Sequence, residues 1–352
     1  MKILKIKYFL PFIIMQLVMI MTCTDPVSPV YQFDAPRYNW ELDTMVYYDV
    51  LDIWGYDTNC VLYLTSATLL KYDGVSYTEY NTYNGHYPFC IAGVSKTHTY
   101  LGGGDLSSGY ANARPVIWKW DGNALVEIPV IDTSGRHYCL DYAYAVSEDE
   151  IWFGSENGVL LQYKNGQFNF FNDFDTSYMV VPLMTGVNNK FYIGTFKQVV
   201  LNPQYTEIDY YEDIYERDND SWIKVWSDVL TNGKEGVCFR TLNVHQLIGT
   251  KKQSLHKFIN NDFVLVHNVN AFKLSNVFDG TSENELLVQG YNLSGHSEND
   301  FGFLHWNGNR WSFEYNFNQF TSYNNKIRKI QDRYYCTSGI RAQTRFLKAT
   351  PK

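Results

Sequence analysis

Charged residues make up only 19% of the 352-residue sequence, and no stretch of it is rich in lysine and arginine. A protein that neutralises nucleic-acid phosphates needs such a basic stripe, so we expect no nucleic-acid partner. The formal net charge of −8 also argues against a purely electrostatic hold on anionic lipid.

Motifs that gather catalytic or metal-binding side chains are missing as well. The sequence contains no Cys-x-x-Cys, His-x-His, His-Glu-x-x-His or Gly-x-Ser-x-Gly, and no glycine-rich phosphate-binding motif. The paired carboxylates of a glycosidase can lie far apart in a sequence, but no pair stands out here. We therefore expect no cofactor and favour a non-catalytic protein over an enzyme.

Long stretches with the 3.6-residue periodicity of amphipathic helices are also lacking. Aromatic residues make up 17% of the sequence, with 29 Tyr, 22 Phe and 9 Trp. These side chains favour strands, and the composition therefore predicts an all-β fold. The five cysteines after Cys23 are widely spaced among apolar neighbours, which indicates small core residues more than a disulfide framework.

The N-terminus has the features of an export signal. Three lysines precede an apolar run from Tyr8 to Met21, and a cysteine follows at position 23. The sequence Ile20-Met21-Thr22-Cys23 resembles the bacterial lipoprotein signal, and this resemblance implies that Cys23 is lipidated. We expect a signal peptide at 1–22, a lipidated tether at 23–36 and the folded domain at 37–350. The alternative is an ordinary signal peptide or an uncleaved anchor.

A sequence motif that repeats along the chain predicts the fold. Leu160–Phe168 reads as a strand, a tight turn with Asn-Gly, and a second strand opening with an aromatic residue. Variants of it occur near Leu69, Ile117, Leu255 and Leu304. A second strand precedes each copy of this motif and recurs at intervals of about 40–55 residues. This is the period of a four-stranded propeller blade. The recurring strand starts near Val61, Thr99, Ile151, Phe191, Gln246, Glu285 and Tyr334. The spacing predicts a seven-bladed β-propeller of four-stranded blades.

Ring closure should involve both ends of the chain. The last repeat runs out before its outer strand, whereas Tyr38–Leu42 reads as an outer strand without a blade. We expect this N-terminal strand to pair with the C-terminal strand near Phe346, because closure removes an exposed sheet edge.

The repeats resemble the bacterial extracytoplasmic propellers found as lipoproteins and in the ectodomains of two-component sensors, and more distantly kelch-like propellers. Kelch blades carry a glycine pair in each repeat, whereas here only Gly102–Gly104 provides one. The resemblance implies a fold and an envelope location, facing either the periplasm or the cell surface.

The expected blades place short turns on one face and long connections on the other. Long loops on a rigid scaffold are the usual place for recognition, although loops can also drift without a function. The candidate ligand-binding residues on the long-loop face are aromatic or hydrogen-bonding, namely Tyr83, His86, Tyr110, Arg114, His137, Tyr178, Tyr211, Trp222 and His296.

The segment from Tyr205 to Gly236 is the largest expected insertion. It is rich in Asp and Glu, and Trp222 and Trp226 follow at a helix-compatible spacing. Its carboxylates could collect Ca²⁺, but the ordered spacing of a calcium loop is absent. We favour a solvated acidic loop held by the two tryptophans.

Three functions remain open at this stage. The favoured one is an envelope binding or scaffolding module for a glycan, a peptide or a partner protein. The second is a polysaccharide-active enzyme, either a glycosidase or a lyase, with its site at the channel mouth. The third is a structural assembly lipoprotein without a small ligand.

Overall fold

The computed structural model describes most of the chain after residue 33: residues 34–46, 49–81, 85–132, 134–171, 174, 180–187, 190–200, 208–219, 221–231, 238–243, 246–251, 254–269, 272–282, 284–292, 301–316, 325–340 and 343–352. Two compact units are separated at Asp34, and every sheet belongs to the second unit, Ala35–Lys352. No helix of the described residues is long and apolar enough to cross a bilayer.

The described strands form four-stranded antiparallel sheets whose strands follow one another in the sequence. The first three sheets lie between residues 50 and 171. One contains β2 (Val50–Asp57), β3 (Cys60–Thr65), β4 (Thr68–Tyr72) and β5 (Tyr77–Asn81). The next contains β6 (His86–Ser95), β7 (His98–Asp105), β8 (Arg114–Trp120) and β9 (Leu125–Ile128), with a 3₁₀ turn η1 (Tyr110–Asn112) between β7 and β8. The third contains β10 (Tyr142–Ser147), β11 (Glu150–Gly154), β12 (Leu160–Lys164) and β13 (Gln167–Phe171).

Three more sheets of the same plan follow. The fourth contains β14 (Val180–Val187), β15 (Lys190–Val200), β16 (Ile208–Asp218) and β17 (Ser221–Thr231). The fifth contains β18 (Cys238–Asn243), β19 (Gln246–Lys251), β20 (Ser254–Ile259) and β21 (Asp262–Asn268). The sixth contains β22 (Phe272–Ser282), β23 (Glu285–Asn292), β24 (Phe301–Trp306) and β25 (Trp311–Asn316). The remaining sheet combines β26 (Lys326–Ile330), β27 (Arg333–Ile340) and β28 (Gln343–Pro351) with β1 (Tyr38–Val46).

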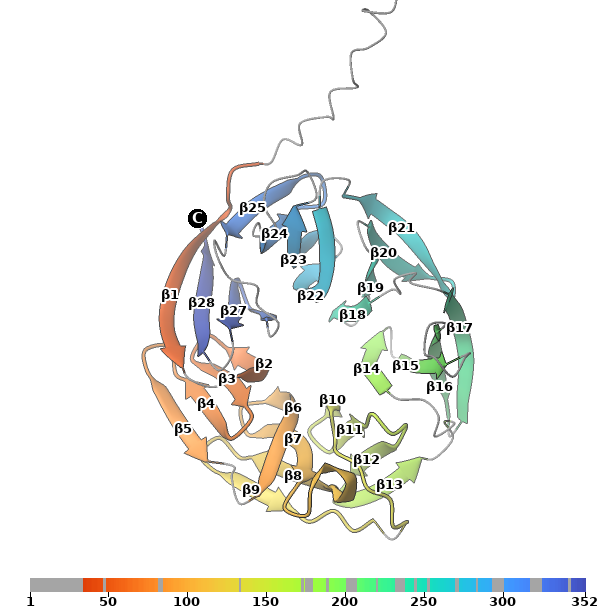
Figure 1. Ribbon diagram of the computed structural model, residues 1–352. Helices are drawn as coiled ribbons and strands as arrows, with labels where there is room; N and C mark the ends of the chain where they lie inside the picture. The colour runs from red at the N-terminus through yellow and green to blue at the C-terminus, as the bar shows by residue number, and fades with distance from the viewer. Residues whose placement is uncertain are drawn as a thin grey trace, which may run out of the picture. The chain divides into compact units, whose positions relative to one another are not determined.

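Within the unit Ala35–Lys352 the sheets are arranged as the blades of a β-propeller (Figure 1). The first strand of each sheet contacts the first strand of the next, and β26 contacts β2, so the succession returns to its start. The outermost strands β5, β9, β13, β17, β21, β25 and β1 follow the rim. The all-β propeller architecture expected from the repeats is therefore present.

The N-terminal strand completes the last sheet. Tyr38 pairs with Pro351, Leu42 pairs with Leu347, and a bulge then brings Thr44 opposite Phe346. The indole of Trp40 stacks on Phe303 of the sixth sheet, with ring centroids 5.3 Å apart. Since β1 belongs to the last sheet and also contacts the sixth, the two ends of the chain hold the ring together.

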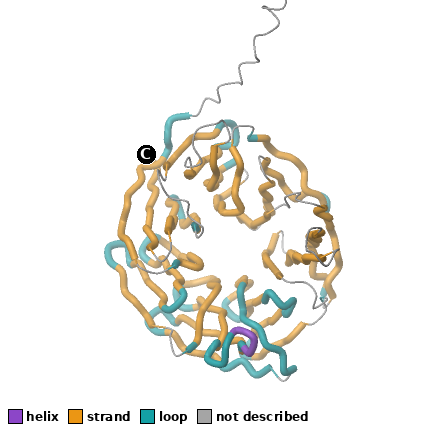
Figure 2. The backbone as a smooth tube through the Cα atoms, in the orientation of Figure 1, coloured by secondary structure: helices purple, strands orange, loops and turns teal. Residues whose placement is uncertain are grey.

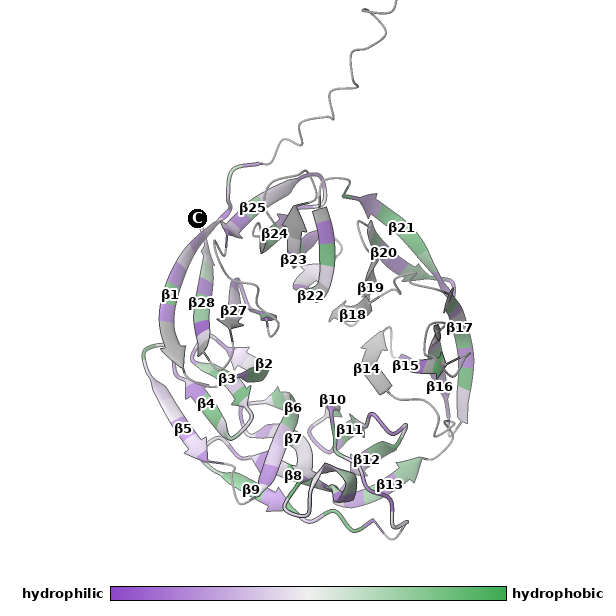
Figure 3. Ribbon diagram, viewed as in Figure 1, coloured by the Kyte–Doolittle hydropathy of each residue, from purple (hydrophilic) through white to green (hydrophobic). Residues whose placement is uncertain are grey.

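Aromatic and aliphatic side chains fill the spaces between sheets. Trp152 is fully buried and meets Phe191 and Trp222 of the fourth sheet at centroid distances of 5.1 and 6.0 Å. Four cysteines of the described residues are buried and free, as expected for small core residues: Cys60, Cys90, Cys139 and Cys336. The alternation of apolar and polar residues along the strands is visible in Figure 3.

The hairpin turns are of two kinds. Asn165-Gly166 is a two-residue turn in which both residues have positive φ, as the sequence predicts. At Asp73 and Asn307, however, the strands end earlier and a four-residue turn replaces the predicted two-residue one. The side-chain oxygen of Asp73 accepts hydrogen bonds from the backbone N–H groups of Val75 and Ser76, which stabilises the wider turn.

The expectation of a solvated acidic loop in the fourth sheet was wrong. The segment expected to be a long acidic loop contains β16 and β17, which pair along most of their length. The Tyr and Ile residues of this segment favour a strand in spite of the acidic residues between them. Trp222 and Trp226 therefore lie on a bulged strand and not on a helix.

Two carboxylates of this hairpin form ion pairs with lysines. Asp213 is buried and lies 2.9 Å from Nζ of Lys224, and Glu216 lies 2.7 Å from Nζ of Lys190. Lysine ammonium groups thus occupy the places beside these carboxylates. No group of His, Cys, Asp or Glu in the described part of the chain has the geometry to hold a metal ion.

Candidate functional site

Two polar clusters of the propeller contain interacting carboxylates, and they lie on different faces. The first, which we term the carboxylate–tyrosine cluster, consists of Tyr110, Asp141, Tyr142 and Glu156. It lies where long connections meet between the second and third sheets. The second, the ring-closing network, surrounds Glu285 at a short turn between the last two sheets.

Three consecutive glycines let the connection before β10 pack closely on β7. A Cβ atom on Gly104 would lie 2.6 Å from Sγ of Cys139, and one on Gly102 would lie 3.0 Å from Cβ of Leu140. The backbone N–H of Leu140 donates to the carbonyl of Gly103 at 3.1 Å. Side chains at these positions would displace the connection, so the glycines fix the position of Asp141.

Hydrogen bonds to backbone carbonyls tie three connections into one surface. The N–H of Tyr138 donates to the carbonyl of Ala113, next to the 3₁₀ turn, at 3.1 Å. The side-chain amide of Asn157 donates to the carbonyl of His137 at 2.9 Å. Figure 2 shows these connections as teal tube around the purple 3₁₀ turn. They belong to loops that follow β7, β9 and β11.

The carboxylates of the cluster lie close enough to affect each other. Oδ2 of Asp141 accepts a hydrogen bond from the backbone N–H of Glu156 at 3.0 Å. Burial, reinforced by the charge of Glu156, raises the pKa of Asp141 to about 7, although that hydrogen bond acts in the opposite direction. No Lys, Arg or His of the described residues forms an ion pair with Asp141 or Glu156. No cationic side chain of the described residues therefore balances the negative charge of this pair.

Two tyrosines border these carboxylates. The hydroxyl of Tyr110 donates to Oε2 of Glu156 at 3.4 Å, and the side chain is 60% exposed. Burial and the two nearby carboxylates raise the pKa of Tyr110 to about 12, and the same causes raise the pKa of Tyr142. Both phenols thus stay protonated at neutral pH. An exposed aromatic ring beside unbalanced carboxylates suits a ligand that carries a cation.

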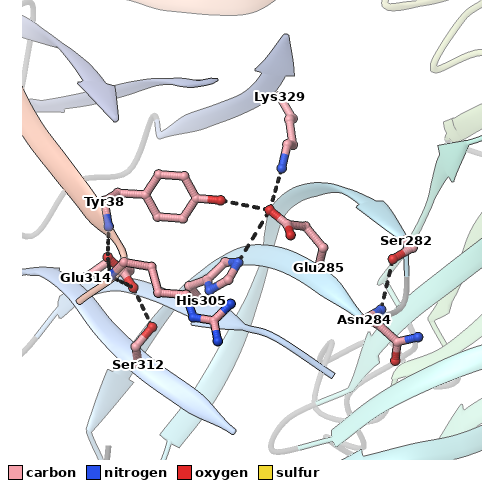
Figure 4. Close-up of polar contacts among 9 residues, drawn as sticks. Tyr38, Ser282, Asn284, Glu285, His305, Ser312, Glu314 and Lys329 are labelled. Carbon is pink, nitrogen blue, oxygen red and sulfur yellow. Dashed lines mark hydrogen bonds and ion pairs between the residues drawn. The ribbon is translucent and has the colours of Figure 1, made fainter. Parts of the chain in front are cut away.

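The carboxylate of the ring-closing network is, in contrast, balanced by its neighbours (Figure 4). Oε1 of Glu285 lies 3.6 Å from Nε2 of His305 and accepts hydrogen bonds from Nζ of Lys329 and, at 2.7 Å, from the hydroxyl of Tyr38. The contact with His305 and the bonds from Lys329 and Tyr38 hold the pKa of Glu285 well below its usual range.

A second buried carboxylate extends this network. Glu314 accepts hydrogen bonds from the backbone N–H groups of Arg37 and Tyr38 and from the hydroxyl of Ser312 (Figure 4). The donors come from β1, β24, β25 and β26, so the network joins the N-terminal strand to two sheets. The carboxylates of Glu285 and Glu314 already accept hydrogen bonds from groups of the protein. We therefore assign it a structural role and take the carboxylate–tyrosine cluster as the candidate functional site.

The structure groups three of the sequence-predicted residues around this site. Tyr110 belongs to the cluster, Arg114 begins β8 two residues after the 3₁₀ turn, and His137 accepts the hydrogen bond from Asn157. His86 lies on the same face at the start of β6, where Nδ1 contacts Oε2 of Glu127 at 3.2 Å.

The remaining predicted residues lie elsewhere. Tyr211 is within β16, near the end of the sheet that faces the long connections. Trp222 adjoins the short β16–β17 turn on the opposite face, and it packs against Trp152 and Phe174. Its placement on the long-loop face was therefore wrong, because the surrounding segment is a hairpin. Cys23, Tyr83, Tyr178 and His296 lie outside the described residues.

Sequence reasoning missed Asp141, Tyr142 and Glu156. Asp141 immediately precedes β10, the inner strand of its sheet, and this position is at the channel mouth in a propeller. Glu156 lies in the Ser-Glu-Asn-Gly turn that follows a β11 strand the sequence did predict. Position within the blade could have identified both residues, since β10 pairs with β11 and places Tyr142 opposite Gly154.

Fold and site together define a β-propeller with a charged and aromatic site among its long connections. No family model and no curated protein matches the sequence. Solved structures do: "YCF48 bound to D1 peptide" superposes with a TM-score of 0.59 at 10% identity, covering 91% of this chain and 100% of that chain. YCF48 from Cyanidioschyzon merolae gives 0.58 at 10% identity, covering 88% and 98%.

A further neighbour is the β-propeller domain of Cps50 (Swd1) from Myceliophteria thermophila, with a TM-score of 0.55 at 8% identity, covering 88% of this chain and 98% of that chain. At these identities the likeness shows the fold alone. The neighbours establish that this chain has the architecture of a β-propeller along most of its length.

Proposed function

We propose that the chain is a non-catalytic β-propeller of the bacterial envelope that binds an extended segment of a partner protein at the carboxylate–tyrosine cluster. The observation that carries the proposal is the unbalanced pair Asp141 and Glu156 beside the exposed ring of Tyr110. A lysine or arginine side chain, or an N-terminal amine, would supply the missing positive charge.

The surrounding loops support a peptide as the ligand. They are held to one another by hydrogen bonds to backbone carbonyls, so their positions do not depend on a bound ligand. A structural neighbour with the same architecture, YCF48, is described as bound to a peptide. That neighbour provides a precedent for peptide binding by this type of scaffold.

We also propose that a lipid on Cys23 anchors the protein, with residues 24–36 as the tether. The basic and apolar segments before Cys23 support this part of the proposal. A propeller on a tether would present its recognition face to other proteins of the envelope. Whether that face points to the periplasm or outward is decided by the lipoprotein sorting of the cell.

Isothermal titration with a peptide panel tests the class of ligand. The panel pairs extended peptides that contain Lys or Arg with matched peptides that contain norleucine, and includes neutral and acidic oligosaccharides. We expect binding only by the cationic peptides. The affinity should fall as the pH is lowered through about 7, because protonation of Asp141 removes one of the two negative charges. Preferential binding of an oligosaccharide would reject the peptide assignment.

The same carboxylate pair favours an enzyme as the second candidate. A carboxyl group with a pKa of about 7 beside a second carboxylate is the arrangement that glycoside hydrolysis uses. Incubation with envelope and plant polysaccharides, followed by reducing-end analysis, tests this alternative. Turnover that disappears in Asp141→Asn and in Glu156→Gln would establish the enzyme and displace the binding module.

A further inference from the structure

The turn that carries Glu156 is built around a buried hydroxyl group. Ser155 directly follows β11 and is fully buried, although its side chain is polar. Its Oγ accepts hydrogen bonds from the backbone N–H groups of Asn157 at 3.2 Å and Val159 at 3.0 Å. The backbone N–H of Ser155 also donates to the carbonyl of Val159 at 3.0 Å. Local bonds of this kind fix the conformation of a turn, so Ser155 determines the direction of the N–H groups in this segment.

Both sequence neighbours of Ser155 are bonded to Asp141. The carbonyl of Gly154 accepts a hydrogen bond from the backbone N–H of Asp141 at 2.9 Å. The backbone N–H of Glu156 donates to Oδ2 of Asp141 at 3.0 Å. The first bond continues the pairing of β10 with β11, whereas the second comes from the turn itself. The direction of the Glu156 N–H toward Asp141 therefore depends on the conformation that Ser155 gives the turn.

The hydrogen bond from the Glu156 N–H opposes the other influences on Asp141. Burial and the charge of Glu156 raise the pKa of Asp141 to about 7, and this hydrogen bond acts in the opposite direction. The titratable groups that face Asp141 are all acids, namely Glu156, Tyr110, Tyr142, Cys90 and Cys139. None of these groups supplies a positive charge, so the ionised form of Asp141 depends on the backbone donor.

We infer that Ser155 is a positioning residue of the carboxylate–tyrosine cluster, because its hydroxyl directs the N–H of Glu156 to Asp141 and thereby favours the ionised carboxylate at neutral pH. Ser155 is fully buried and touches no ligand, so its effect on binding acts through the charge of Asp141. Its importance for binding rests on the proposed function, whereas its effect on Asp141 does not. Loss of the hydroxyl should therefore change the pH range of binding and leave the affinity at high pH intact.

The first sheet provides a matched control. Thr65 ends β3, the strand equivalent to β11, and it is also fully buried. Its Oγ1 accepts hydrogen bonds from the backbone N–H groups of Ala67 at 3.3 Å and Thr68 at 2.9 Å. Only Ser66 and Ala67 lie between Thr65 and Thr68, so this turn has no carboxylate. Thr65→Ala thus removes the same kind of bond from a turn that has no charged group to position.

Carbon-13 NMR of the side-chain carboxyl of Asp141 in the full chain tests the inference without a ligand. We expect Ser155→Ala to raise the titration midpoint by about one pH unit, and Thr65→Ala to leave it at the wild-type value. Ser155→Thr keeps a hydroxyl and should restore the wild-type midpoint. Ser155→Cys has a weaker acceptor of similar size and should shift the midpoint upward, which provides a second variant if alanine prevents folding. Wild-type midpoints in Ser155→Ala and Ser155→Cys would overturn the inference.

Titration with a Lys-containing peptide separates this inference from the proposed function. A rise of about one unit in the pKa of Asp141 leaves about a tenth of it ionised at pH 7 instead of about half, so Ser155→Ala should bind about fivefold more weakly there. At pH 9 Ser155→Ala and the wild type should bind almost equally. If the wild type binds no cationic peptide, the proposed function fails, while the NMR midpoint still decides the role of Ser155. An affinity that falls by the same factor at pH 7 and pH 9 would mean that Ser155 acts on the fold alone and would overturn the inference.

Discussion

The phenolic hydroxyl of Tyr38 donates a hydrogen bond to Oε1 of Glu285 at 2.7 Å, although the two residues are 247 positions apart in the sequence. Tyr38 is the first residue of β1, and Glu285 is the first residue of β23 in the preceding sheet. The bond therefore connects the N-terminal strand to a sheet with which it has no ladder. Ring closure thus involves side chains across the blade interface in addition to the strand pairing of β1 with β28.

Tyr38→Phe removes this bond and leaves the ring in place. We expect the free energy of unfolding to fall by about 2 kcal/mol, because Tyr38 is buried and the acceptor is charged. Chemical denaturation at pH 7 measures the loss. Tyr72→Phe is the control, since its hydroxyl bonds to the neighbouring Gly74 carbonyl within one hairpin. An equal loss in both variants would mean that Tyr38 has no special part in closure.

Trp40→Ala tests the packing side of closure. The indole stacks on Phe303 and contacts Tyr315 of the sixth sheet, so truncation should lower the free energy of unfolding by about 3 kcal/mol. Thermal unfolding followed by near-ultraviolet circular dichroism reports the change. Tyr56→Ala removes an aromatic ring that is 51% exposed and should cost much less. An unchanged melting temperature for Trp40→Ala would contradict closure by β1.

The raised pKa of Asp141 predicts a particular dependence of stability on pH. The folded protein binds the proton of Asp141 more tightly than the unfolded chain does. Stability is therefore greatest below the unfolded pKa of about 4 and is lost as the pH rises through about 7. Asp141→Asn cannot ionise, so it should be more stable than the wild type at pH 8, by roughly 3 kcal/mol, and equal to it near pH 4.

Asp132 provides a control of opposite sign. Burial opposes its ionisation, but hydrogen bonds from Ser134 and Tyr138 outweigh burial and lower its pKa. Its contribution is present above about pH 4 and is lost as the pH falls further. Asp132→Asn should therefore be less stable than the wild type at pH 7. Denaturation curves of Asp141→Asn and the wild type that stay parallel from pH 4 to 8 would refute the assignment for Asp141.

Fatty-acid labelling tests the anchor. Metabolic labelling should mark the wild-type protein but not Cys23→Ser, and only the wild type should stay with the membrane fraction after cell lysis. Because every mature lipoprotein chain carries several acyl groups, each buried CH₂ adding about 0.8 kcal/mol, removal of the lipid should release the protein completely. Equal labelling of both proteins would reject lipidation at this cysteine.

Local patterns made the strands and the closing pairing predictable. The aromatic residues after each Asn-Gly or Asp-Gly turn, and the lone strand at Tyr38–Leu42, required only short-range reasoning. The β16–β17 hairpin was missed because its acidic residues follow no two-residue alternation and indicated a solvated loop, whereas in the structure Asp213 is paired with Lys224 of the adjacent strand.

The candidate site was less accessible to sequence reasoning. Tyr110 was predicted from its loop, whereas Asp141 and Glu156 were missed although the pairing of β10 with β11 places them side by side. Tyr110 comes from the preceding sheet, and the connection before β10 lies against that sheet through hydrogen bonds to Gly103 and Ala113. Contacts of this kind depend on packing between segments, for which the sequence alone has no short-range pattern.

The central claim is that the propeller recognises a cationic segment on the face with the long connections. Titration of the best-binding Lys-containing peptide against Tyr110→Ala, Glu156→Gln, Asp73→Ala and Asn307→Ala tests it most directly, since the last two residues lie in short turns of the opposite face. We predict at least a tenfold loss of affinity in the first two variants and less than a twofold change in the others. Unchanged binding by Tyr110→Ala and Glu156→Gln, with loss in Asp73→Ala or Asn307→Ala, would contradict the account.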